Sequence, residues 1–190
     1  MAEKSKAVCL PGVDKAEFKK AVIGVFSAGD PRVDDQSRKR CQNIVRMVAD
    51  SISGKVVMPD KSAVDVVYSD ILVDTEPQAD IVAQQFRQAG VNVLVCVPDT
   101  WAFPQLTTIS LLQQFPEDTP INITCGNSAP KPGVVYAHAT NGAISQYGKM
   151  VTLNVGSWSD KGLEPEIKEK TIDDLVDWCY AAVTRVVLKG

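Results

Sequence analysis

Residues Val91 to Val97, VNVLVCV, form the most clearly buried strand of the sequence and decide its fold class. A nearly continuous apolar run of this length is typical of a strand that helices cover on both faces. Before it, Glu76 to Ala89 has the spacing of an amphipathic helix, which Gly90 ends. Strands and helices alternate in this way from about residue 21 onward, which indicates a parallel sheet. We therefore expect Val91 to Val97 at the centre of that sheet.

The other strands are placed outward from this one. Ala21 to Phe26, AVIGVF, predicts the first strand, and Pro120 to Cys125 and Met150 to Val155 predict the last two. For the second strand, Val56 to Met58 competes with Val64 to Tyr68, and the sequence does not rank the two segments. The predicted fold class is α/β, a doubly wound, flavodoxin-like or Rossmann-like parallel sheet of about five strands with helices on both faces.

The predicted helices cover residues 34–52, 76–89, 106–115, 134–147 and 171–188. Thr171 is expected as the N-cap of the last helix. The helical spacing predicts which side chains of the first two helices face the core: Cys41, Ile44, Val45, Val48, Ile52, Ile81, Val82, Gln85 or Phe86, and Ala89. Arg38, Lys39, Arg40 and Asp50 fall mostly off the core face. We divide the chain into an N-terminal extension, residues 1–20, and one α/β domain, residues 21–190.

The composition excludes several functional classes. The chain is 45% hydrophobic and 23% charged, with a formal net charge of -3, so it lacks the basic surface that nucleic-acid binding needs. The cysteines contain no CxxC pair and predict reduced thiols, mostly in the core, without a disulfide framework or zinc site: Cys9, Cys41, Cys96, Cys125 and Cys179. The sequence has neither the apolar stretch of a signal peptide nor that of a membrane span, so we expect a cytoplasmic protein.

The chemistry is expected in the loops that follow the strands, because ligands of open α/β sheets bind beyond the carboxyl ends of the strands. Four such loops are SAGDPRVDD, PDTWAFPQ, GNSAPKPG and GSWSD. In the first, Asp30 and Arg32 place a guanidinium beside carboxylates, where it can grip a hydroxylated or anionic ligand; a solvated ion pair is the equal alternative. In the second, Trp101 offers an apolar ring to a sugar or a partner, unless it is a lid packed over the strand ends.

Familiar sites of this architecture do not fit the sequence. GNSAPKPG matches neither the Walker pattern nor GxGxxG, and SAGDPR lacks the hydroxyl-rich run that flavodoxins need. Asp99 sits loosely where a response regulator accepts its phosphoryl group, but the first strand ends in Phe26 and Ser27 without an acidic pair. His138 lies on a predicted helix and is expected to be packed or solvated. No catalytic residue is assigned, because His, Asp and Glu form no tight cluster.

The order of motifs resembles the N-terminal region of the L-fucose isomerase family, which includes D-arabinose isomerases. The resemblance rests on VIGVFSAGDPR (Val22 to Arg32), VLVCVPDTW (Val93 to Trp101) and PGVVYAHATNGAISQYG (Pro132 to Gly148), followed by a strand ending in Gly156 and a Ser-Trp-Ser-Asp turn. It implies an aldose-ketose isomerase, an intramolecular oxidoreductase of carbohydrate metabolism, that moves a proton through an enediol with the help of Mn²⁺.

What the resemblance implies for this chain is narrower. The metal ligands, two acidic residues and a His, belong to later domains of the family, so this chain holds no cofactor and is expected to be inactive alone. The first domain in the family leans over a neighbouring subunit's active site, which makes Arg32 and Trp101 the substrate-binding candidates and implies sugar, the remaining isomerase domains and other subunits of a homo-oligomer as partners. Asp99 and Phe103 depart from the residues expected in the Trp loop, which leaves the sugar preference open.

Two other functions remain as alternatives. The chain could be a stand-alone binding or assembly module whose Trp101 loop docks a protein or a free sugar without turnover. It could also be a nucleotide-binding or flavin-binding domain. The 190 residues end near the point where the family's second domain should begin, so we expect either a piece of a longer isomerase or a natural short protein that kept the fold.

Overall fold

The computed structural model describes residues 20–127 and 132–189 of the chain. In this part, five parallel strands form one sheet in the order β2-β1-β3-β4-β5. The strands are β1 (Val22–Phe26), β2 (Asp65–Tyr68), β3 (Val93–Cys96), β4 (Ile121–Gly126) and β5 (Val151–Gly156). The helices are α1 (Asp35–Ile52), α2 (Glu76–Gln88), η1 (Pro104–Leu106), α3 (Thr108–Leu112), α4 (Gly133–Gln146) and α5 (Glu169–Lys189).

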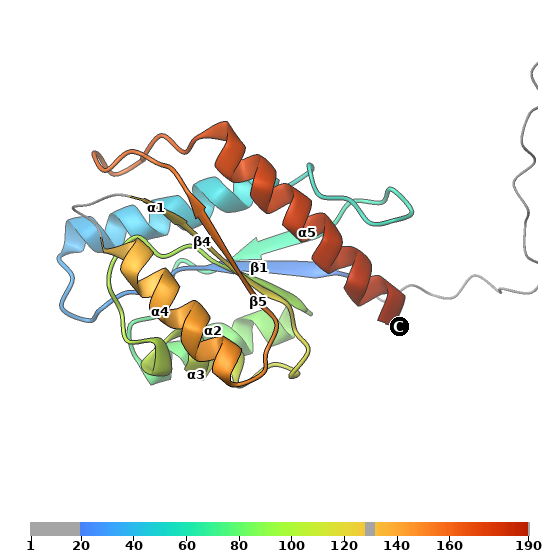
Figure 1. The fold of residues 1–190 in the computed structure, drawn as a ribbon, viewed down its shortest axis with the longest axis horizontal. Helices are drawn as coiled ribbons and strands as arrows, with labels where there is room; N and C mark the ends of the chain where they lie inside the picture. The colour runs from blue at the N-terminus through green and yellow to red at the C-terminus, as the bar shows by residue number, and fades with distance from the viewer. Residues whose placement is uncertain (1–19, 128–131, 190) are drawn as a thin grey trace, which may run out of the picture.

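Helices cover both faces of the sheet, as Figure 1 shows. α1 and α5 pack together on one face, whereas α2, α3 and α4 cover the other. This arrangement confirms the predicted doubly wound α/β fold. The division into an extension, residues 1–20, and a domain, residues 21–190, stays a prediction, because all of the extension except Lys20 lies outside the described residues.

The core follows the strand order. Every residue of β1, β3 and β4 is buried, while the edge strands β2 and β5 are partly exposed. β3 is the middle strand, as its apolar run predicts. Four cysteines, Cys41, Cys96, Cys125 and Cys179, are buried and form no disulfide, and Cys9 lies outside the described residues. Burial raises the pKa of the Cys96, Cys125 and Cys179 thiols to about 12.

The structure selects the second of the two candidates for the second strand. β2 pairs in parallel with β1 over Asp65–Tyr68. Val57 of the other candidate forms only an isolated antiparallel bridge with Ala63. The segment from Val56 to Met58 is therefore part of the connection between α1 and β2, and it covers the core with the buried side chains of Val56 and Met58.

Four predictions about side chains on helices were wrong. Ile81 is 47% exposed and Ala89 is exposed, because Ala79, Val82, Ala83 and Phe86 form the buried face of α2. Thr171 is not an N-cap: α5 begins at Glu169, and the Thr171 hydroxyl accepts a hydrogen bond from the backbone N–H of Ser157 at 2.9 Å. Arg40 is buried, although the helical spacing put it mostly off the core face.

In the described residues, no helix is both long and apolar enough to cross a membrane.

Candidate functional site

The strand order places a crevice at the carboxyl edge of the sheet, between the ends of β1 and β3. The chain leaves β1 toward β2 on one side, while β3 lies on the other side of β1. In sheets of this order, ligands bind at such a switch point. The loops after β1 and β3 are the ones that carry Asp30, Arg32 and Trp101, so the topology brings the predicted residues to one place.

An open hollow of about 540 Å³ lies at this switch point. Its lining combines residues from the β1 loop, the start of α1, the β3 loop and the start of α4: Asp30, Arg32, Val33, Asp34, Ser37, Thr100, Trp101 and Pro132. Arg32 and Trp101, the two substrate-binding candidates, therefore line the same hollow. Their role in binding is a prediction that this geometry does not test.

Asp30 and Arg32 form a bidentate ion pair. Arg32 Nε donates to Asp30 Oδ1 at 2.8 Å, and Nη2 donates to Oδ2 at 2.7 Å. The backbone N–H of Arg32 also donates to Oδ1. These contacts hold the pKa of the Asp30 carboxyl at about 2, so the carboxylate is ionised at neutral pH. The side chain of Asp30 is only 8% exposed, whereas that of Arg32 is 79% exposed, so the carboxylate orients an exposed guanidinium that lines the hollow.

Trp101 is half-buried, and its ring makes two edge-to-face contacts. Its centroid lies 6.2 Å from that of Phe103 and 6.5 Å from that of Tyr136. Tyr136 is fully buried on α4, and its hydroxyl is hydrogen-bonded to Thr107 at 2.9 Å and Thr108 at 2.6 Å. Trp101 thus packs against the core on one side and lines the hollow on the other, which combines features of both sequence interpretations.

Beside the hollow lies a buried polar cluster that the sequence analysis did not predict. Arg40 of α1 donates from Nε to Asp99 Oδ2 at 2.6 Å and from Nη2 to Oδ1 at 3.3 Å. Trp158, in the loop after β5, donates from its indole Nε1 to Asp99 Oδ1 at 2.9 Å. The side chains of Arg40 and Asp99 are 2% and 1% exposed. Neither helical spacing nor any motif indicates this pair, because its members are 59 residues apart.

Two glycines allow this cluster to pack closely. A Cβ atom on Gly126, the last residue of β4, would lie 2.4 Å from Trp158 Nε1. A Cβ atom on Gly133 at the start of α4 would lie 2.7 Å from the carbonyl oxygen of Pro98 and 2.8 Å from Asp99 Cα. The segments that follow β3, β4 and β5 are therefore in direct contact at the carboxyl edge, next to the loop that carries Trp101.

The other sequence candidates lie apart from the hollow or outside the described residues. His138 is exposed on α4 and does not line the hollow. Half of the GNSAPKPG loop, residues 128–131, lies outside the described residues. Among the residues that the structure describes, His, Cys, Asp and Glu form no group of three or more that could hold a metal ion. We therefore assign no metal ligand to this part of the chain.

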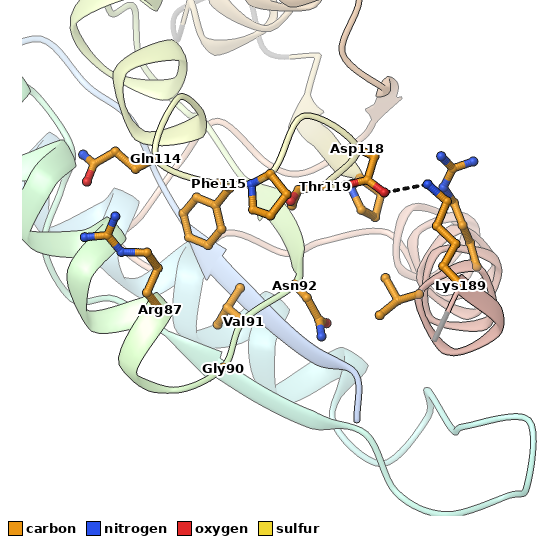
Figure 2. Close-up of a pocket in the computed structure, with 13 residues that line it drawn as sticks. Arg87, Gly90, Val91, Asn92, Gln114, Phe115, Asp118, Thr119 and Lys189 are labelled. Carbon is orange, nitrogen blue, oxygen red and sulfur yellow. Dashed lines mark hydrogen bonds and ion pairs between the residues drawn. The ribbon is translucent and has the colours of Figure 1, made fainter. Parts of the chain in front are cut away.

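A second pocket, of about 280 Å³, lies at the opposite edge of the sheet, before β3 and β4. Figure 2 shows Arg87 and Lys189 on opposite sides of it, with Lys189 directed at Asp118. Gln114 donates its side-chain amide to Asp80. Because Gln114, Asp118 and Lys189 are already paired and Arg87 lies on the opposite side of the pocket from Lys189, we place the candidate site in the hollow at the carboxyl edge.

Comparison with known proteins agrees with this architecture. Residues 20–190 match the family model described as "L-fucose isomerase, first N-terminal domain". L-fucose isomerases of Streptococcus pneumoniae strains Hungary19A-6 and TIGR4 are each 28% identical to the chain over 161 residues, and that of strain CGSP14 is 27% identical. Each alignment covers 79% of this chain and 26% of the relative, so the chain spans about a quarter of the length of these relatives. The chain therefore belongs to the L-fucose isomerase family, as an N-terminal domain of that family.

Proposed function

We propose that the hollow between Arg32 and Trp101 forms one wall of a sugar pocket in an aldose-ketose isomerase similar to L-fucose isomerase. The remaining wall comes from other isomerase domains, in a neighbouring subunit of a homo-oligomer. The observation that carries this proposal is that Arg32 and Trp101, from loops 69 positions apart in the sequence, line one hollow at the topological switch point.

The chemistry of the two side chains suits a sugar. Asp30 uses one edge of the Arg32 guanidinium, and the remaining N–H groups can donate to hydroxyl oxygens. Trp101 supplies an apolar ring on which the C–H groups of a sugar can pack. One polar edge and one apolar face are the usual composition of a site that orients a small hydroxylated ligand.

The same residues do not supply an acid and a base. The ion pair with Arg32 keeps the pKa of Asp30 far below neutral pH, so Asp30 is an ionised carboxylate and is poorly suited to act as a general acid or base. Asp34 caps α1 by accepting from the backbone N–H of Ser37 at 2.6 Å. In the proposed enzyme, Mn²⁺ would polarise the sugar oxygens, and its ligands would come from outside this chain. Arg32 and Trp101 would bind and orient the sugar and exclude water from one side of it.

A complementation experiment tests the proposal. The chain is mixed with an L-fucose isomerase relative that lacks only its first domain, and isomerisation of L-fucose and D-arabinose is measured with added Mn²⁺. We expect activity in the mixture but not with either protein alone. Trp101→Ala should abolish the restored activity, and Arg32→Gln should raise the KM, whereas Tyr147→Ala on the exposed end of α4 should change neither.

A lack of activity in every mixture would contradict the proposal. If both proteins are folded and associate, but no mixture is active, the wall is not part of a catalytic pocket. Binding of L-fucose to the chain alone, followed by NMR chemical shifts, then decides the stand-alone alternative: binding without turnover favours a binding module, and a bound nucleotide or flavin in the purified protein would favour the third function.

A further inference from the structure

We propose that Asp99, held by Arg40 and Trp158, is the positioning residue that fixes Trp101 in the hollow. This inference rests on the proposed sugar-binding role of Trp101, and it adds three residues to the determinants of that site: Asp99 from the same loop, and Arg40 and Trp158 from two other chain segments.

Arg40 uses all five of its N–H donors within the protein. Two go to the Asp99 carboxylate, and three go to backbone carbonyl oxygens of the loop after β5: Ser159 at 2.6 Å, Lys161 at 3.1 Å and Gly162 at 2.7 Å. One turn further along α1, Asn43 donates to the carbonyl of Leu163 at 3.1 Å. A guanidinium with every donor satisfied has one orientation, so α1 and this loop together present a fixed cation to Asp99.

Asp99 is held from a third direction by Trp158. The indole N–H completes three hydrogen bonds to one carboxylate, and the ring packs where Gly126 has no side chain. The backbone of Pro98 and Asp99 is pressed against Gly133 of α4. The main chain at residue 99 is therefore confined by contacts with α1, α4 and the loop after β5.

Trp101 lies two residues beyond this anchor, in a loop that is also fixed at its far end. Thr107 donates its hydroxyl to the carbonyl of Phe103 at 2.8 Å and is hydrogen-bonded to Tyr136. Between the two anchors, Thr100 is buried and donates to the carbonyl of Trp101 at 3.1 Å. The position of the Trp101 ring thus depends on where Asp99 is held.

The same sheet edge contains a matched control. Arg38, on the same helix as Arg40, forms an ion pair of 2.8 Å with Asp74, whose side chain is 5% exposed. Asp74 follows β2 instead of β3, and neither Arg38 nor Asp74 lines the hollow. Removing the Asp74 charge therefore perturbs a partly buried ion pair of α1 without acting on the Trp101 loop.

The first experiment measures the position of Trp101 without any ligand. The full chain is labelled with 5-fluorotryptophan, and its three ¹⁹F resonances are assigned with Trp101→Phe, Trp158→Phe and Trp178→Phe. Asp99→Asn should shift the resonances of both Trp158 and Trp101, while Asp74→Asn should leave both in place. A variant in which the Trp158 resonance shifts and the Trp101 resonance does not would show that Asp99 only secures the loop after β5, and would overturn the inference.

Asp99→Asn leaves a buried cation and could prevent folding, so Arg40→Gln combined with Asp99→Asn provides a second, uncharged pair to be measured in the same way. A shifted Trp101 resonance in that variant supports the inference, and an unshifted one overturns it.

L-fucose binding then separates this inference from the proposed function. We expect affinity to fall about tenfold in Asp99→Asn and to be unchanged in Asp74→Asn. A shifted Trp101 resonance with no sugar binding by the wild-type chain, either alone or in the complementation mixture, would contradict the sugar-binding role but not the positioning. Wild-type affinity in Asp99→Asn with an unmoved Trp101 resonance would leave the proposed function standing and reject the positioning role.

Discussion

The two edges of the parallel sheet differ in how their charges are held. At the carboxyl edge, the carboxylates of Asp30, Asp74 and Asp99 are each at least nine-tenths buried and paired with an arginine. At the amino edge, the ion pairs Lys20–Asp65 and Lys189–Asp118 have side chains that are about half exposed or more. When a buried ion pair loses one partner, the remaining charge is left unpaired in the interior, which lowers the stability of the fold strongly. Exposed ion pairs contribute little to stability, because water and salt screen them.

This difference indicates that the carboxyl edge is the more rigid of the two edges. Ligand sites on α/β sheets are built from loops mounted on a rigid scaffold. In the described residues, buried ion pairs hold the loops at the carboxyl edge, whereas the two ion pairs at the amino edge are exposed. We therefore expect substitutions of similar size to have larger effects at the carboxyl edge.

The largest effect is expected from breaking the buried pair. Arg40→Leu leaves the Asp99 carboxylate buried without its cation and should reduce the free energy of unfolding by about 3–5 kcal/mol. Urea denaturation followed by circular dichroism measures this loss. Adding Asp99→Leu to Arg40→Leu should recover part of it, because the unpaired charge is then gone. A loss below about 1 kcal/mol for Arg40→Leu would put this pair in the same class as the exposed ones.

Substitution of one glycine at each edge is expected to have an effect of intermediate size on stability. Gly126→Ala at the carboxyl edge would drive a methyl group into Trp158 and should cost about 1–3 kcal/mol, with a change in Trp fluorescence. Gly90 at the amino edge has open space around its Cβ position but a φ of +76°, so Gly90→Ala should cost only about 1 kcal/mol of backbone strain and leave the fluorescence unchanged. If the two variants lost the same free energy of unfolding and had the same Trp fluorescence, the proposed difference between the edges would be wrong.

A smaller effect is expected on the titration of Asp30. Its folded pKa of about 2 lies below the unfolded value of about 3.9, so the stabilisation from the ion pair is complete above about pH 4 and is lost as the pH falls toward 2. Arg32→Gln should raise the pKa of Asp30 toward 3.9, which carboxyl ¹³C NMR can follow. Asp60, whose pKa is lowered by hydrogen bonds from Ser62, should titrate as before. An unchanged Asp30 pKa would mean that Arg32 does not hold it.

The smallest effect is expected at the amino edge. Asp118→Ala removes the partner of Lys189, yet both side chains are about half exposed, so the urea midpoint should not change measurably. The same variant should leave the ¹⁹F resonance of Trp101 unmoved. A clear loss of stability would show that the pocket in Figure 2 is held as firmly as the opposite edge.

The fold was largely predictable from the sequence because the buried strands are short apolar runs. VNVLVCV became the middle strand β3, and the first, fourth and fifth strands begin and end within one residue of the predicted bounds. The second strand was ambiguous because both candidates are short, and the structure places β2 at a partly exposed edge, where apolar patterning is weak. Ile81 was misplaced because the small residues Ala79 and Ala83 form part of the buried face of α2.

The site was predictable only in part. Strand order and loop position were sufficient to bring Arg32 and Trp101 to one edge, since the carboxyl ends of parallel strands meet there. The role of Arg40 was not predictable, because arginine is rarely buried without a partner, and its partners here come from two distant loops. The helical pattern predicts which face of a single helix is apolar, and it carries no information about contacts with distant loops.

The reach of Arg40 along the chain also has a consequence for how the protein is made. Its partners lie as far as Gly162, 122 residues later, and every strand pair of the sheet needs a crossover connection. During synthesis, α1 leaves the ribosome long before the segment that neutralises and covers its arginine. We therefore expect Arg40 to stay hydrated until the loop after β5 has been synthesised, and the cluster of Arg40, Asp99 and Trp158 to be among the last parts of the domain to form.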